Sequence, residues 1–315
     1  MALYDGPLVD AHHHLWSLTT GRYPWLQDER RERMVFGPTA KLLRDYLLDD
    51  YLADAAGSSL AMSIHVEAGH DRAAPLAETA WLQAIADARG FPHGLVAWAP
   101  MGTPDFPRVL ARQARFRNLR GIRAVAAWHE DPALSFAADP HLLDDPRFVR
   151  DAAALAEAGL SLDLLVYPAQ LPAVARLARA LPALTVILDH AGSPLDRRAQ
   201  GMADWRDGLA NVAAAGNTAI KLSGLAAYDH RWTEASLAPV VGAILACFGA
   251  RRCLFGSDFP VAGLHGSFAA HYGAMRRLLA DLSAAEQRAI FHDNAARVYR
   301  LAPSGAVARF APRSA

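Results

Sequence analysis

Residues 160–192 read LSLDLLVYPAQLPAVARLARALPALTVILDHAG and hold one strand–helix–strand repeat. The segments 160–167 and 184–192 are rich in continuous apolar residues, and the Ala-, Leu- and Arg-rich segment 169–182 between them has helical periodicity. Strands that are buried on both faces show this uninterrupted apolar pattern, and a helix is the usual connection between parallel strands. The stretch therefore predicts a βαβ unit of a parallel sheet.

The same alternation recurs along most of the chain. Strand candidates lie at residues 6–12, 59–66, 93–100, 119–125, 160–167, 184–192, 217–224 and 252–260. Helical segments lie at residues 41–57, 75–90, 105–116, 144–159, 169–182, 202–216, 233–249 and 267–282. Eight such units in 315 residues predict an α/β fold, a single-domain (β/α)8 TIM barrel. A doubly wound open sheet is the structural alternative.

Two of the strand–helix connections are long. The first runs from about residue 15 to residue 39, and the fourth from about residue 126 to residue 145. Long loops in compact domains are usually functional or disordered, and loops that follow barrel strands lie on the active face. We expect one barrel domain over residues 1–301 and a flexible C-terminal tail over residues 302–315.

Composition and charge argue against several classes of function. The chain has 52% hydrophobic and 20% charged residues, with Lys+Arg and Asp+Glu equal at 32 each and no block of like charge. Nothing therefore indicates binding to nucleic acid or to an anionic membrane surface. The sequence has no basic leader followed by an apolar stretch, no apolar run of about 18 residues and only two cysteines. We expect a cytoplasmic protein with a small-molecule substrate and no membrane association.

Polar residues stand at the carboxyl ends of strands that should be apolar. They are Asp10, His12, His14, His65, Glu67, Arg123, Asp163, Asp189, His190, Lys221, Ser223, Ser257 and Asp258, while the third strand contributes only Trp98. The carboxyl ends of barrel strands converge on one pocket. Each residue alone has a structural explanation, such as a capped histidine or an ion pair at the rim. Together they predict an active site.

The histidines of VDAHHHLW, residues 9–16, can be assigned to faces of their strand. Side chains alternate along a strand, so His12 and His14 point one way and His13 points the other. His12 and His14 can bind a common ion, whereas His13 is interpreted as structural. Asp258 follows the last strand and precedes Phe-Pro. A carboxylate at that place can bind a metal or accept a proton from water.

With these residues placed, the chain resembles the amidohydrolase superfamily, and within it the amidohydrolase-related branch of lactonases. That branch includes sugar-acid lactonases, sulfomuconolactonase and pyrone-dicarboxylate lactonase. The resemblance extends from residue 9 to about residue 301 and rests on DAHHHLW, VILDHAG, IKLSGL and LFGSDFPV in that order. It implies a (β/α)8 barrel that hydrolyses a lactone.

The resemblance also implies metal ligands, and this chain departs from the pattern at one of them. In many superfamily members the paired histidines, a histidine after the fifth strand and the final aspartate bind one or two divalent ions. Here the fifth strand carries Asp163 and no histidine, so a binuclear centre is not expected. We expect one divalent ion held by His12, His14 and Asp258, with His190 as a further candidate, and zinc rather than magnesium because imidazole favours it. Metal-free catalysis, which the resembled pyrone-dicarboxylate lactonase is thought to use, is the alternative.

The expected reaction is the opening of the ester ring of a small polar lactone by water, with sugar-acid lactones as the first substrate class. Asp258 is the expected general base, and Asp258 or His190 would protonate the leaving alkoxide. The oxyanion would be held by the metal or by a cation such as Arg123 or Lys221. The expected substrate-binding residues are His65, Glu67, Trp98, Arg123, Asp163, Lys221 and Trp25.

Other functions are compatible with parts of this pattern. A metal-dependent decarboxylase of the same superfamily, acting on an aromatic or enoic acid, shares the paired histidines and the final aspartate but normally keeps a fifth-strand metal histidine. A non-catalytic sugar-binding barrel would keep aromatic residues without needing Asp258. Amide hydrolysis is less favoured, because such enzymes usually keep the fuller metal set. A homodimer is a further expectation, since barrels of this branch often dimerise.

Overall fold

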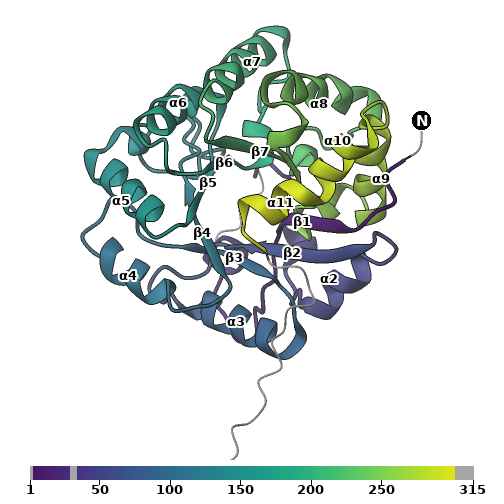
Figure 1. Cartoon of the computed structure of the whole chain (residues 1–315). Helices are drawn as coiled ribbons and strands as arrows, with labels where there is room; N and C mark the ends of the chain where they lie inside the picture. Colours follow the sequence, from purple (N-terminus) through teal and green to yellow (C-terminus); the bar gives the residue numbers. More distant parts are fainter. Residues whose placement is uncertain (1–2, 29–33, 302–315) are drawn as a thin grey trace, which may run out of the picture.

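The computed structural model describes residues 3–28 and 34–301, and its centre is one sheet of parallel strands. The strands are β1 (Leu8–His13), β2 (Leu60–Val66), β3 (Gly94–Trp98), β4 (Leu119–Val125), β5 (Ser161–Leu165), β6 (Val186–Leu188), β7 (Thr218–Leu222) and β8 (Cys253–Phe255). Each strand pairs with its sequence neighbours in the order β1 to β8. A doubly wound sheet would reverse its strand order, so the predicted barrel is confirmed and the open-sheet alternative is excluded (Figure 1).

The barrel closes where β8 meets β1. Phe259, just after β8, forms a parallel bridge with His13. The backbone N–H of His14 donates to the carbonyl of Phe259 at 2.8 Å, and the N–H of Asp258 donates to the carbonyl of His12 at 2.7 Å. The closing seam therefore places the histidine run beside Asp258.

Helices surround most of the sheet (Figure 1). They are α1 (Pro24–Gln27), α2 (Leu48–Asp54), α3 (Ala77–Arg89), α4 (Phe106–Gln113), α5 (Pro146–Glu157), α6 (Leu171–Ala180), α7 (Ala199–Ala213), α8 (Glu234–Phe248), α9 (Phe268–Leu278), α10 (Ala284–Arg288) and α11 (Asn294–Val298). Helix α6 shows how the sequence builds one unit, because Leu171, Val174 and Leu177 recur at helical spacing and are all buried. Pro172 lies in its first turn, where a missing N–H costs no hydrogen bond. No helix of the described residues is long and apolar enough to cross a membrane.

One predicted helix is much shorter in the structure. The sequence predicts a helix over residues 41–57, but α2 covers only Leu48–Asp54. Before it, Tyr46 and Trp16 exchange two backbone hydrogen bonds of 2.9 and 3.0 Å. The Asp45 carboxylate also accepts hydrogen bonds from two backbone N–H groups of the first long loop. These tertiary bonds hold that loop against the barrel in place of a helical turn.

Apolar side chains fill one end of the barrel, and α11 covers that end (Figure 1). Val9, Ile187 and Leu254 point inward from their strands and pack with Val298 of α11 and with Tyr299, which follows it. The polar residues of the strands' carboxyl ends lie at the opposite end. The predicted tail over residues 302–315 lies outside the described residues.

Candidate active site

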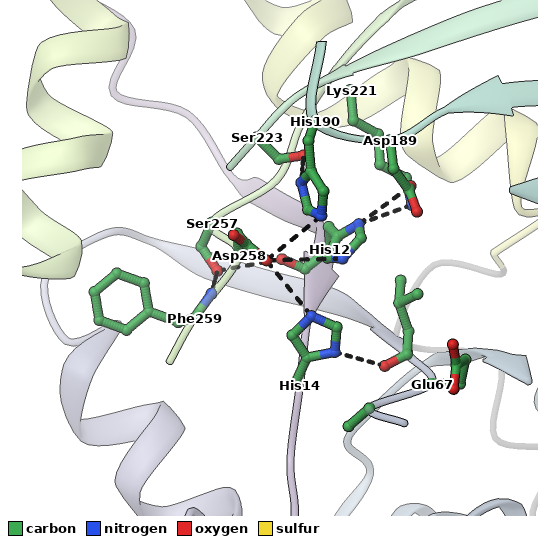
Figure 2. A network of polar contacts seen from close by, with 12 residues as sticks. His12, His14, Glu67, Asp189, His190, Lys221, Ser223, Ser257, Asp258 and Phe259 are labelled. Atoms are coloured by element: carbon green, nitrogen blue, oxygen red, sulfur yellow. Dashed lines mark hydrogen bonds and ion pairs between the residues drawn. The ribbon is translucent and has the colours of Figure 1, made fainter. Parts of the chain in front are cut away.

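Three imidazole nitrogens converge on one carboxylate oxygen at the carboxyl ends of the strands (Figure 2). Nε2 of His14, His190 and His12 lie 3.5, 3.8 and 3.9 Å from Oδ1 of Asp258. All four side chains are buried. The structure thus brings the predicted ligands His12, His14 and Asp258 together, and it adds His190 to the same cluster.

A β-bulge in β1 directs His12 and His14 into the site. Val9 and Ala11 already pack in the apolar interior of the barrel, and the register between β1 and β2 shifts in the second half of β1. A bulge adds one residue to a strand and changes the side to which the following side chains point. His12 and His14 therefore also face inward, which strict alternation from Val9 would not give.

The neighbours of the two histidines have structural contacts. His13 points away from the site, as predicted, and its ring stacks on Tyr51 with centroids 4.0 Å apart. Asp10 accepts hydrogen bonds from the backbone N–H and the hydroxyl of Ser257, at 2.8 and 2.5 Å, and from the Tyr51 hydroxyl at 2.9 Å. Burial is the main cause that raises the pKa of Asp10 to about 6. Asp10 therefore ties β1 to the segment that presents the final aspartate.

The second nitrogen of each imidazole is held by the protein. Nδ1 of His14 lies 2.8 Å from the carbonyl of Val66 and donates to it, so Nε2 is the nitrogen that faces Asp258. Nδ1 of His190 lies 3.0 Å from the hydroxyl of Ser223. Such contacts behind a ligand fix the orientation of the ring and are typical of metal-binding histidines.

The donor set fits a single zinc ion. Nε2 of His12 is buried and, among the described residues, has no hydrogen-bond partner; leaving such an atom unpaired costs about 1–3 kcal/mol. Ligand atoms around one tetrahedral zinc ion stand roughly 3.3 Å apart, and the three nitrogens here lie 3.5–3.9 Å from the carboxylate oxygen. The ligand atoms of His12, His14 and Asp258 also lie within 4.8 Å of one another. His12, His14 and Asp258 are therefore the residues that would hold the ion, and His190 lies beside them.

The backbone is strained at two of these residues. Asp258 and His190 adopt the left-handed conformation, with φ of 58° and 49°, which costs about 1–3 kcal/mol for each such residue and is concentrated at functional sites. The strain is held by surrounding bonds. The N–H of Asp258 donates to His12, and the indole of Trp205 donates to the carbonyl of Ala191 at 2.9 Å.

A buried ion network lies directly behind His12. Lys221 is 0% exposed, and its ammonium lies 2.6 Å from Asp163, 2.9 Å from Asp189 and 3.2 Å from Nδ1 of His12. Asp189 in turn lies 3.3 Å from the same nitrogen, and the Tyr299 hydroxyl donates to Asp163 at 2.5 Å. Burial alone would raise the pKa of Asp189. The nearby Lys221 ammonium and, after it, His12 lower this pKa by more, so it lies well below its usual value.

The structure places four of the expected substrate contacts outside the cavity lining. Lys221 and Asp163 are fully buried and are not among the residues that line the cavity. His65 is buried with its Nε2 3.2 Å from the carbonyl of Leu15. Trp98 does not line the cavity either, because its ring is covered by the guanidinium of Arg72 at 4.5 Å.

A cavity of about 350 Å³ opens above Asp258. His14 and His190 lie on its floor, and the expected contacts Glu67, Arg123 and Trp25 line its sides. Further lining residues for which the sequence suggested no role are His70, Arg72, Phe36, Phe136 and Val261. Phe36 and Phe136 lie in the two long loops, and that loop length was the only available signal for them.

Charged groups are paired along the side of the cavity formed by β2 and β4. Glu67 lies 3.0 Å from the guanidinium of Arg72 and 3.7 Å from that of Arg123. Burial opposes ionisation of Glu67, but the two arginines outweigh it and lower its pKa to about 2. Behind it, burial and the Glu67 charge raise the pKa of Glu78 to about 8. The cavity wall therefore presents two cations and one carboxylate, with a protonated carboxyl beneath them.

Two residues near the candidate metal ligands belong to the site although no role was predicted for them from the sequence. Asp189 and Ser223 were recognised only as polar strand ends, and they orient His12 and His190. Their place at the carboxyl ends of β6 and β7 was the available signal. Contacts behind a ligand cannot be assigned before the ligands' ring orientations are known.

Comparison with known proteins identifies the family. A family model described as amidohydrolase matches residues 9–301. The uncharacterized protein y4mH from Sinorhizobium fredii is 37% identical over 297 residues, which cover 94% of this chain and 99% of that protein. An L-fucono-1,5-lactonase from Burkholderia multivorans is 33% identical over 321 residues, with coverage of 96% and 98%.

Solved structures agree with this result. An amidohydrolase from Burkholderia multivorans with bound zinc matches with a TM-score of 0.80 at 31% identity, over 94% of this chain and 100% of that chain. A 2,6-dihydroxybenzoate decarboxylase from Rhizobium is more distant, with a TM-score of 0.62 at 16% identity over 93% and 98% of the two chains, and shares the fold alone. The chain belongs to the amidohydrolase family and is a hydrolase.

Proposed function

We propose that this protein hydrolyses a lactone, using Asp258 as the general base. The observation that carries the proposal is the buried Asp258 carboxylate, surrounded by three imidazoles at the floor of a substrate-sized cavity. The lactonase relatives, at 30% and 33% identity over nearly the whole chain, support this reaction class. A zinc ion held by His12, His14 and Asp258 would supply polarisation of the ester carbonyl and a more acidic bound water.

The chain's own residues perform the proton transfers. Asp258 accepts a proton from water while the water oxygen bonds to the carbonyl carbon, and the carbonyl electron pair moves onto its oxygen. Burial opposes the charge of Asp258, but His190 and then His14 outweigh it, so its pKa lies below the usual value and the carboxylate is ready to act. When the ring C–O bond breaks, the leaving alkoxide takes the proton back from Asp258.

Arg123 is the cation placed to stabilise charge in the cavity. Its side chain lines the cavity, and its Nε lies 3.0 Å from Asp189, which fixes the guanidinium. A charged donor held in place before the reaction lowers the barrier, because it need not reorganise as the oxyanion forms. Lys221 is too deeply buried for this role, so Arg123 is the better candidate of the two considered from the sequence.

Sugar-acid lactones are the first substrates to test. The L-fucono-1,5-lactonases are the relatives with a stated substrate, and Glu67, Arg72 and Arg123 could bind ring hydroxyls along one side of the cavity. Decarboxylation is the second candidate and is less favoured, because β5 carries Asp163 in the buried ion network and offers no fifth-strand metal histidine.

The test is acid release, followed with a pH indicator, from a panel of aldonolactones and unsaturated dicarboxylic lactones. The zinc-loaded protein should release acid from at least one lactone with saturation kinetics. The same protein incubated with aromatic and enoic acids should consume no proton and release no carbon dioxide. Carbon dioxide release without lactone opening would replace the proposed function with decarboxylation.

A further inference from the structure

The cavity above Asp258 has two chemically different sides. Its floor and one side carry the ionisable groups already described, from the ends of β1, β2, β4, β6 and β8. Most of the remaining lining is apolar, and Trp25, Phe36 and Phe136 contribute large rings to it. We call these three residues the aromatic wall. All three are half-buried.

The three rings of the aromatic wall pack against one another. Trp25 meets Phe36 edge to face, with centroids 5.8 Å apart and planes at 84°. Phe36 and Phe136 lie nearly parallel at 15°, with centroids 6.2 Å apart. Both are favourable aromatic geometries. The two long loops, after β1 and after β4, are therefore joined by this contact into one surface.

The polar edge of Trp25 is turned away from any ligand. Its indole N–H donates to the carbonyl of Ala68 at 2.7 Å. The neighbouring Gly69 has φ of 74°, and a Cβ there would lie 2.8 Å from the Trp25 ring. The glycine is thus required both by its backbone conformation and by the close approach of the indole. What Trp25 offers to the cavity is apolar ring surface.

Aliphatic side chains continue the aromatic wall toward the floor. Val125 and Leu165, at the ends of β4 and β5, and Val261, after β8, belong to that part of the lining, and Tyr228 packs in the same cluster as Val125, Leu165 and Phe136. None of these six side chains can donate a hydrogen bond into the cavity, since the single N–H among them is already bonded. A substrate hydroxyl directed at these six side chains would lose its water without gaining a partner from them, which is unfavourable, and Tyr228 carries the one hydroxyl in this part of the described lining.

We propose that the substrate is a lactone with an apolar substituent, aromatic or branched alkyl, on the ring atom that faces the aromatic wall, and that Phe36 and Phe136 select it. The proposal rests on the proposed lactone hydrolysis and differs in substrate from the sugar-acid lactones named there, which present hydroxyls and no large apolar substituent to the aromatic wall. The ester would lie at the floor beside Asp258, polar ring groups would face Arg123 and Glu67, and the substituent would fill the apolar side. Binding sites of this size, at the low end of about 300–1,000 Å³, are commonly apolar with a few polar groups that fix orientation.

The test compares lactones of one ring size that differ only in their substituents. We would measure kcat/KM for γ-butyrolactone, γ-phenyl-γ-butyrolactone and an aldono-1,4-lactone, and repeat the series with six-membered rings. The phenyl lactone should exceed both others at least tenfold. Phe136→Ala should lose about tenfold on the phenyl lactone and less than twofold on the unsubstituted one. Phe116→Ala, a half-buried phenylalanine outside the cavity lining, is the matched control and should change neither.

Two results would overturn the proposal. One is an aldonolactone opened as fast as the phenyl lactone; the other is an equal loss on all lactones in Phe136→Ala, with Phe136→Leu included in case the alanine variant folds poorly. Calorimetric binding of the ring-opened hydroxy acids separates this proposal from the function itself. If no lactone is opened, lactone hydrolysis fails, and tighter binding of the phenyl acid that Phe136→Ala weakens tenfold would still support the selective wall. Equal binding of the phenyl acid and the aldonate would refute it.

Discussion

The floor and the aromatic wall of one cavity are built in opposite ways. On the floor, His14, His190 and Asp258 are buried at strand ends, and each has a further contact with the protein behind it. On the wall, Phe36 and Phe136 are half-buried, lie in long loops and are held by ring packing. Strand ends give the precision that proton transfer needs, and loops vary without disturbing it. We therefore assign the reaction to the floor and the selection of the substrate to the aromatic wall.

The largest effect on turnover is expected for Asp258, the residue proposed as the general base. Asp258→Asn keeps the shape of the side chain but removes its ability to take a proton, so kcat should fall about a thousandfold or more. KM should change little. The surface variant Asp293→Asn is the matched control. Steady-state kinetics together with circular dichroism would check both. Turnover within tenfold of the wild type in a folded Asp258→Asn variant would remove Asp258 as the base.

The next largest effect is expected for a change to Lys221, in the buried ion network behind His12. Lys221→Met removes the cation that faces Asp163 and Asp189 and leaves two buried carboxylates, which should destabilise the protein by about 3–5 kcal/mol. His12 would lose its orientation, so bound zinc should fall below half of the wild-type content. Lys41→Met changes an exposed lysine and should alter neither quantity.

Chemical denaturation and elemental analysis of metal content would measure the two readouts of the Lys221→Met experiment. Full zinc content in a destabilised variant would mean that Lys221 contributes to stability and is not needed for zinc binding. Unchanged stability together with full zinc content would show that the buried network behind the floor is not needed. The geometry of the floor would then have to be explained without the buried network.

The sequence predicted the floor much better than the wall. Strand ends could be recognised because apolar runs stop at polar residues, and a barrel brings these ends together. His12, His14, His190 and Asp258 were found in this way and meet within one cluster. The β-bulge that aims the two histidines is invisible in the sequence, since it appears only as a shift in pairing with β2.

Contacts through loops and buried charges could not be predicted. Asp163 and Lys221 are strand-end residues like the others, and only the packing of Tyr299 from the far end of the barrel shows that they lie behind the site. Phe36 and Phe136 are far apart in sequence, and no pattern announces their contact. A homodimer and a cytoplasmic location stay predictions.

Glu67 and Glu78 are two buried carboxyls whose pKa values are shifted in opposite directions. The pKa of Glu78 is about 8 in the folded protein against an ordinary value of 4.5, because of burial and then of Glu67. Between these values the unfolded chain has lost the proton and the folded protein keeps it, so stability falls as pH rises from about 4.5 to about 8. The pKa of Glu67 is lowered to about 2, so its contribution is lost only below this window.

Glu78→Gln should therefore flatten the pH dependence of stability. Glutamine resembles the protonated carboxyl, so the wild type should lose on the order of 1–3 kcal/mol more than the variant between pH 5 and pH 8. Glu157→Gln, at an exposed glutamate, should follow the wild type. Denaturant melts at several pH values would measure this. Parallel curves for Glu78→Gln and the wild type would mean that Glu78 is ionised in the folded protein.

The smallest effect is expected at the far end of the buried network. Tyr299→Phe removes one hydroxyl that donates to Asp163, and Asp163 keeps the ammonium of Lys221 at 2.6 Å and the hydroxyl of Ser161 at 3.1 Å. Stability should fall by about 1 kcal/mol, while zinc content and KM stay at wild-type values. Denaturant melts and metal analysis would show whether that holds. A zinc loss as large as that of Lys221→Met would mean that the floor depends on the whole length of the barrel, and the floor could no longer be treated as a local structure set apart from the wall.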